Sequence, residues 1–191
     1  HEEIMGEWGN KQNDAIGAIL FRVGELEEKG IKVIRNENDT RILQKLVFYL
    51  KSVEYWQDAD NGVWEENEEV HASSVGACVA GLKKISKIVD VPIELINHGK
   101  HTLKELLPRE SVTKEADLAL LSLIYPFNVV SKEMAKKIVK NVEFNLLRAK
   151  GVIRYDNDVY YNKGFGEAEW CMGFPWLAII HKQLGNTGKY A

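Results

Sequence analysis

The sequence is poor in three features that mark specialised classes of protein: cysteine, excess basic charge and long apolar runs. Its 191 residues include two cysteines, Cys78 and Cys171, which are too few for a disulfide framework and favour a reducing compartment. The 25 Lys and Arg residues stand against 28 Asp and Glu, so the net charge of -3 offers no basic excess to neutralise phosphates. These features argue against a disulfide-stabilised domain and against a nucleic-acid-binding protein.

Apolar runs are short throughout. None approaches the roughly 20 residues that a membrane-spanning helix requires, and the N-terminal segment lacks the apolar region of a signal peptide. We therefore expect a cytoplasmic protein that does not contact a membrane. The sequence begins abruptly at His1, without a methionine or a helix cap, so we also expect a fragment of a longer polypeptide.

What the sequence does contain is apolar residues spaced three and four apart, the pattern of helices with one buried face. Ser131 is the expected cap of one helix, Pro175 the first position of another, and Ser73 or Ser74 the cap of a third. Gly30 supplies a stop signal. The pattern predicts an all-α protein with helices at 14–29, 40–54, 73–89, 113–125, 131–147 and 175–184.

Two long links, 55–72 and 148–174, interrupt the expected helices. Links longer than about 12 to 15 residues inside a compact domain are usually functional. The second contains the one strand-like piece, residues 151–161, which we expect to fold as a small hairpin or a loop. Both links combine aromatic rings with carboxylates, and the second adds Arg154, a mixture that suits a sugar because rings stack on its C–H faces while its hydroxyls need polar partners.

Four motifs, in order, resemble glycoside hydrolase family 15, the glucoamylase family: WGNKQNDA (8–15), GVWEE (62–66), RYDNDVYYN (154–162) and FPWLA (174–178). Between them, LVFYL, VHASSVG, LLPRES and YP resemble the glucoamylase-like domain of phosphorylase kinase alpha and beta regulatory subunits. Each motif is weak alone, but their order across nearly the whole chain is specific.

The resemblance implies about half of an (α/α)6 barrel, with residues 1–191 as a single catalytic-domain fragment and the active site in loops at one end. It implies inverting hydrolysis that releases glucose from the non-reducing ends of α-glucans or related α-glucosides, without a cofactor or a metal ion. The alternative is a non-hydrolytic carbohydrate-binding or regulatory domain of the phosphorylase kinase type. The expected partners are an α-glucan or oligosaccharide, together with a second copy or the rest of the same polypeptide.

The site residues follow from the same resemblance. Glu65 matches the general acid, whose protonation near neutral pH needs an apolar wall and a nearby like charge, here Trp64 and Glu66. The general base is expected in a later loop, beyond the point that matches the C-terminal QLGNTGKYA, and Glu167 and Glu169 lie in the wrong loop for that role. The expected sugar contacts are Trp8, Trp64, Glu66, Arg154, Tyr155 and Asp158.

Simpler interpretations remain open for several of these residues. The Trp-Glu-Glu stretch also fits a solvated loop, and Trp8 and Trp176 also fit the core. His98 and His101 are spaced like a metal pair but lack further ligands. His71 is expected to cap a helix, and Arg109 and Glu110 to form a structural ion pair or contact substrate.

Overall fold

The computed structural model describes residues 10–158, 168–186 and 188. Within these ranges the chain is helical and contains no strand, as the apolar spacing predicts. None of the described helices is both long and apolar enough to cross a membrane. The helices are α1 (Asn13–Glu28), α2 (Glu37–Ser52), α3 (Ala72–Ile85), α4 (Ile93–Leu106), the 3-10 helix η1 (Leu118–Leu123), α5 (Lys132–Leu146) and α6 (Gly173–Leu184).

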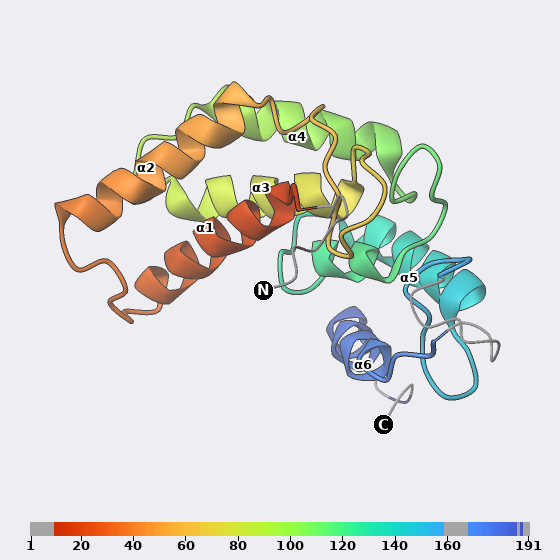
Figure 1. Ribbon diagram of the computed structural model, residues 1–191. Coiled ribbons are helices and arrows are strands. Elements are labelled where there is room, and N and C mark those ends of the chain that lie inside the picture. The colour runs from red at the N-terminus through yellow and green to blue at the C-terminus, as the bar shows by residue number, and fades with distance from the viewer. Residues whose placement is uncertain (1–9, 159–167, 187, 189–191) are drawn as a thin grey trace, which may run out of the picture.

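Helix α3 is the centre of the molecule, packing against α1, α4 and η1 (Figure 1). Every residue from Ala72 to Leu82 is buried, so this helix has no solvent face along that length. Helices α1 and α3 run parallel, because Gly17 lies against Ala77 and Gly24 against Lys84. A Cβ atom on Gly81 would lie 2.3 Å from the carbonyl oxygen of Gly17, so only glycine permits this backbone approach.

Several predicted helix ends are confirmed. The Ser131 hydroxyl accepts a hydrogen bond from the Met134 amide at 3.2 Å and caps α5. Gly185 follows α6 in the left-handed conformation, at a φ of 90°. The cap predicted for α3 is wrong: His71 occupies that position, and Ser73 and Ser74 lie inside the first turn, where their hydroxyls donate to buried carboxylates.

Two predicted elements differ in the structure. Helix α4 was not predicted, because polar residues interrupt its apolar positions Leu95, Ile96 and Leu103. The helix expected at 113–125 forms only η1, because Asp117 turns the chain: its carboxylate accepts from the Ala119 amide at 2.7 Å.

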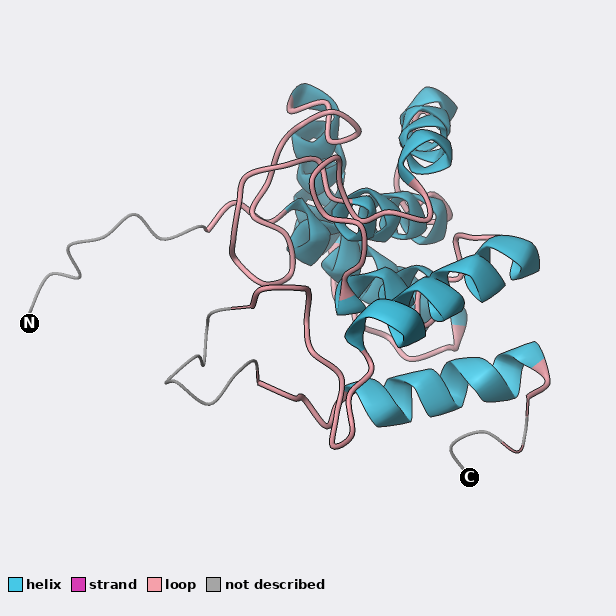
Figure 2. Ribbon diagram, turned by 90° about the vertical axis from the view of Figure 1, so that its right-hand side faces the viewer, coloured by secondary structure: helices cyan, strands magenta, loops and turns pink. Residues whose placement is uncertain are grey.

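The segment 151–161, expected as a small hairpin or a loop, is described only to residue 158, and this part is a loop. Its backbone pairs singly with other segments: Val152 with Leu147 and Trp170, and Tyr155 with Asp117. Loop segments therefore gather on one side of the molecule (Figure 2). The segment directly before η1 contacts both long links, because Lys114 pairs with Glu66 of the first and Asp117 with Tyr155 of the second.

Candidate functional site

The site begins with the loop between α2 and α3, which a buried aspartate closes. Asp60 accepts hydrogen bonds from the Asn13 amide at 2.9 Å and the Ser74 hydroxyl at 3.1 Å, so it ties the loop to the first turns of α1 and α3. Backbone bonds between Asp60 and Glu69 close the loop at its base. The first turns of α1 and α3, which pack together, therefore hold the loop at Asp60.

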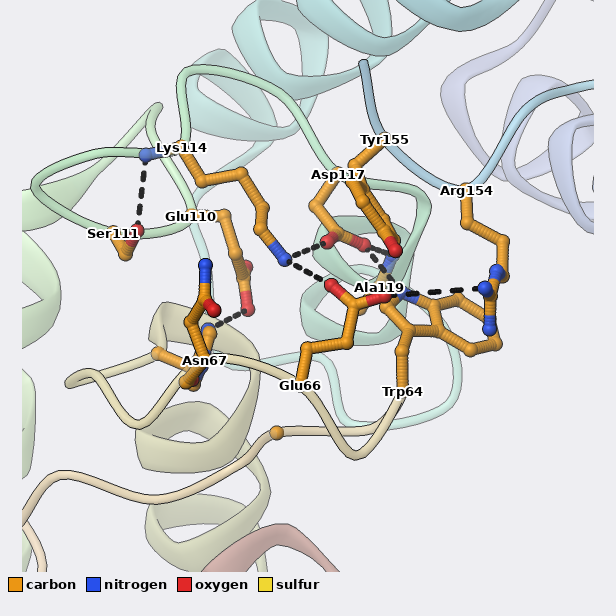
Figure 3. Close-up of polar contacts among 12 residues, drawn as sticks. Trp64, Glu66, Asn67, Glu110, Ser111, Lys114, Asp117, Ala119, Arg154 and Tyr155 are labelled. Atoms are coloured by element: carbon orange, nitrogen blue, oxygen red, sulfur yellow. Dashed lines mark hydrogen bonds and ion pairs between the residues drawn. The ribbon is translucent and has the colours of Figure 1, made fainter. Parts of the chain in front are cut away.

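This loop turns neighbouring side chains in different directions. Glu65 adopts a φ of 57°, in the left-handed region that non-glycine residues seldom occupy. Its side chain is exposed, with Gln12 Nε2 at 3.5 Å from its carboxylate. Trp64 and Glu66 face inward instead: the Trp64 indole N–H donates to Asp117 at 2.7 Å (Figure 3).

Among the residues that the structure describes, the rings of Trp64, Tyr155 and Trp170 lie beside Arg154, with their centres 5.2 to 5.6 Å from its guanidinium. Its guanidinium donates two parallel hydrogen bonds to Asp158, at 2.7 and 2.8 Å, and Asp158 is 1% exposed. This bidentate pair holds the guanidinium plane in one orientation.

Lys114 completes the arrangement. Its ammonium lies 3.3 Å from Glu66 and 3.1 Å from Asp117, and 4.2 Å from the centre of the Tyr155 ring. Glu66 also lies 3.9 Å from Arg154. We call this group the loop cluster; Figure 3 shows most of it, and its members are Trp64, Glu66, Lys114, Asp117, Arg154, Tyr155 and Asp158.

Burial shifts the protonation of the loop cluster. Desolvation raises the pKa of Glu66, although Lys114 and Arg154 oppose the shift. Desolvation would lower the pKa of Lys114, but Asp117 and Glu66 outweigh it and hold that pKa above its usual value. Burial also raises the pKa of Asp117, so the cluster keeps its ammonium group charged while Glu66 and Asp117 are both easier to protonate than usual.

A second group of buried polar residues lies at the start of α3, where the loop ends. The carboxylate of Glu110 accepts from the hydroxyl and the amide of Ser73 and lies 3.5 Å from His71 Nδ1. Burial by itself lowers the pKa of His71, but the hydrogen bond and charge of Glu110 raise it to about 9. The expected pairing of Arg109 with Glu110 is wrong, because Arg109 instead pairs with Glu115 at 3.0 Å.

The predicted site residues thus divide into three groups. Trp8 lies outside the described residues. Glu65 lies at the exposed rim, beside Glu66. The other five, from links far apart in sequence, come together in the loop cluster, and they are Trp64, Glu66, Arg154, Tyr155 and Asp158.

Sequence reasoning missed Lys114 and Asp117. Both lie in the segment 113–125, which the apolar spacing predicts as a single helix. One signal was present: Asp117 directly precedes the apolar run LALLSL, as a capping residue does.

His98 and His101, which are spaced like a metal-binding pair, contact other side chains. The ring of His98 stacks on Trp56 with centroids 4.6 Å apart, and His101 pairs with Glu105 at 3.3 Å. Across residues 10–158 and 168–186, no group of three or more potential ligands is suited to a metal ion. Trp176 is half-buried against the core, and its indole N–H donates to the Tyr125 carbonyl at 2.7 Å.

Comparison with known proteins agrees with the motifs. The family model described as glycosyl hydrolases family 15 matches residues 1–92. A probable phosphorylase b kinase regulatory subunit alpha from Caenorhabditis elegans is 30% identical over 175 residues, covering 81% of this chain and 14% of the relative. The skeletal muscle isoform from Oryctolagus cuniculus is 29% identical with the same coverage. The chain thus spans about a seventh of the length of these relatives.

Solved structures give the fold. A wild-type glycosidase aligns with a TM-score of 0.76 at 21% identity, covering 95% of this chain and 52% of that one. A glycosidase variant in complex with glucose aligns with a TM-score of 0.75 at 22% identity, covering 94% and 51%. The predicted fold, about half of a glucoamylase-type (α/α)6 barrel, is therefore confirmed.

Proposed function

We propose, on the premise that this chain is a glucoamylase-like domain of the glycoside hydrolase family 15 type, that it forms the glucose-binding side of an inverting α-glucoside hydrolase. One observation carries this proposal: the Trp64 and Tyr155 rings, from two separate links, both lie beside the Arg154 guanidinium, and Trp64 directly precedes Glu65 in sequence. Rings beside fixed hydrogen-bonding groups suit a neutral sugar better than an ion or an apolar ligand.

In this proposal the loop cluster binds the sugar, and Glu65 takes part in cleaving the glycosidic bond. Arg154 and Lys114 are held by carboxylates, so they can donate further hydrogen bonds to sugar hydroxyls without losing their orientation. Glu66 accepts from a hydroxyl. Trp64 forms a wall of the sugar pocket together with Tyr155.

Glu65 is proposed as the general acid that protonates the leaving glycosidic oxygen. It directly follows Trp64 in the loop, and its side chain is exposed. A sugar bound against Trp64 would exclude water from this side of the loop. Inversion also needs a general base about 6.5 to 9.5 Å from the acid. We propose that it comes from outside these residues, because the three cluster carboxylates already bind Lys114 or Arg154.

The test uses the full-length protein with maltose and maltooligosaccharides. Glu65→Gln is expected to lower kcat for glucose release by several orders of magnitude while sugar binding persists, because protonation of the leaving oxygen belongs to the transition state. Glu68→Gln, an exposed glutamate of the same loop, is the matched control and should leave kcat unchanged. A change confined to KM in the Glu65 variant contradicts its role as the acid. NMR of the fresh product should show the inverted anomer, β-glucose.

The second candidate function is a carbohydrate-binding or regulatory domain without hydrolysis. The observation that favours it is that the inward carboxylates are each neutralised by Lys114 or Arg154, while Glu65 points to the exposed rim. Relatives named as kinase regulatory subunits agree with this alternative. Oligosaccharide binding by the full-length protein without any release of glucose would select it.

A further inference from the structure

A concave surface lies beside the loop cluster, and Lys114 belongs to both. This depression has a volume of about 380 Å³ and is formed by three segments that are distant in sequence. They are residues 113–116 before η1, Phe144 and Asn145 near the end of α5, and the turn at Asp156 and Asn157. We call it the outer depression.

Phe144 is the unusual residue of the outer depression. Helix α5 buries its opposite face through Ile138, Val142 and Leu146, whereas the Phe144 side chain is 84% exposed. The ring therefore makes little contribution to the core. An aromatic face that is open to solvent beside amide and carboxylate groups is the arrangement that stacks on a sugar ring.

Lys114 connects the outer depression to the loop cluster. Its side chain lines the depression, while its ammonium contacts Glu66 and lies over the Tyr155 ring. The turn at Asp156 and Asn157 directly follows Tyr155 in sequence. The outer depression, which Phe144 also lines, thus adjoins the loop cluster through Lys114.

The polar groups of the outer depression favour a neutral ligand. Its charged residues are one cation, Lys114, and two anions, Glu115 and Asp156, and Glu115 is paired with Arg109. The Asn145 carboxamide nitrogen donates to the side-chain oxygen of Asn141 at 2.6 Å and to its backbone oxygen at 3.0 Å, so the orientation of the carboxamide is fixed. Phosphate-rich polymers would meet net negative charge here, and an apolar peptide would find one large apolar side chain.

We propose that the outer depression is a sugar subsite, with Phe144 as a stacking platform for glucosyl units farther along the α-glucan whose end lies in the loop cluster. This inference rests on the proposed carbohydrate site, and it adds that the protein distinguishes long chains from disaccharides. Phe144 then acts on affinity for the chain and takes no part in bond cleavage.

The experiment measures binding by calorimetry with the full-length protein, using maltose and maltoheptaose and, in parallel, isomaltose and isomaltoheptaose. Phe144→Ala is expected to weaken binding of the long member of the recognised pair about tenfold, the effect of losing roughly half of a buried phenylalanine face, and to leave the disaccharide unchanged. Phe144→Trp should preserve the preference for the long chain. Phe48→Ala, which removes a ring that is 53% exposed on α2, is the matched control and should change neither affinity.

Equal affinities of the wild-type protein for long and short sugars, or an unchanged preference in Phe144→Ala, would overturn the subsite. Binding of neither sugar would overturn it together with the proposed carbohydrate site. If the length preference depends on Phe144 but no glucose is released, the subsite stands and hydrolysis fails. If glucose is released without any effect of Phe144, hydrolysis stands and the subsite fails.

Discussion

The two ends of the parallel helices α1 and α3 both carry ion pairs, yet the pairs differ in burial. At the loop end, Glu110 contacts His71 and Ser73 with 1% of its surface exposed. At the far end, Glu28 pairs with Lys84 and Lys87, and these side chains are 33 to 66% exposed. A buried charge that loses its partner keeps its desolvation cost, whereas an exposed charge is simply hydrated. The same kind of contact therefore has different consequences at the two ends.

The largest effect is expected from Glu110→Ala. This change leaves His71 and Ser73 buried without their acceptor, so the free energy of unfolding should fall by about 3 to 5 kcal/mol. Chemical denaturation followed by circular dichroism measures it. A loss no larger than that of an exposed substitution would show that the buried pair has no special role.

The second effect is on pH dependence at the loop end. The pKa of His71 is raised in the folded protein to about 9, above its ordinary 6.5. Its contribution to stability is therefore complete below pH 6.5 and is lost as the pH rises through 9. Denaturation midpoints should fall over this window, and His71→Gln should remove most of that fall. A slope that persists in the variant would assign it to other groups.

A smaller effect is expected from Trp64→Phe, which keeps an aromatic wall but removes the N–H that binds Asp117. Asp117 retains Lys114 and the Ala119 amide, so the loss of stability should be about 1 to 3 kcal/mol. Because the ring also loses its fixed orientation, sugar affinity should fall with it. Calorimetry with maltose checks the affinity, and wild-type values for both measurements would contradict the role given to this bond.

The smallest effect is expected at the far end. Glu28→Gln removes both exposed ion pairs, and the denaturation midpoint in moderate salt should not change measurably. A shift comparable with that of Glu110→Ala would show that burial does not separate the two ends as described.

The same contrast explains how much the sequence predicted. Trp64, Glu66, Arg154 and Asp158 were identified because they belong to ordered motifs, and the structure brings them together. Lys114 was missed because its partner Glu66 lies 48 residues earlier in the sequence. Its other partner, Asp117, lies three residues later, and only the fold shows that all three side chains meet.

Backbone conformation accounts for most of the remaining differences. The exposed direction of Glu65 follows from its positive φ. A glutamate does not signal such a backbone conformation in the sequence, as a glycine would. Helix α4 was missed because its apolar positions are few, and it forms because it covers α3. The local spacing of apolar residues predicted the helices well, while contacts between distant segments decided the site.

The crossing of α1 and α3 limits how this protein can evolve. With Gly17 and Gly81 in backbone contact, any larger residue at either position must push the helices apart, since a Cβ atom on Gly17 would lie 2.5 Å from backbone atoms of α3. Such a displacement would move Asp60 relative to Asn13 and with it the whole loop. Substitutions in the loop can therefore change ligand preference while the helix spacing stays constant. Substitutions of the two glycines cannot, because they change the spacing itself.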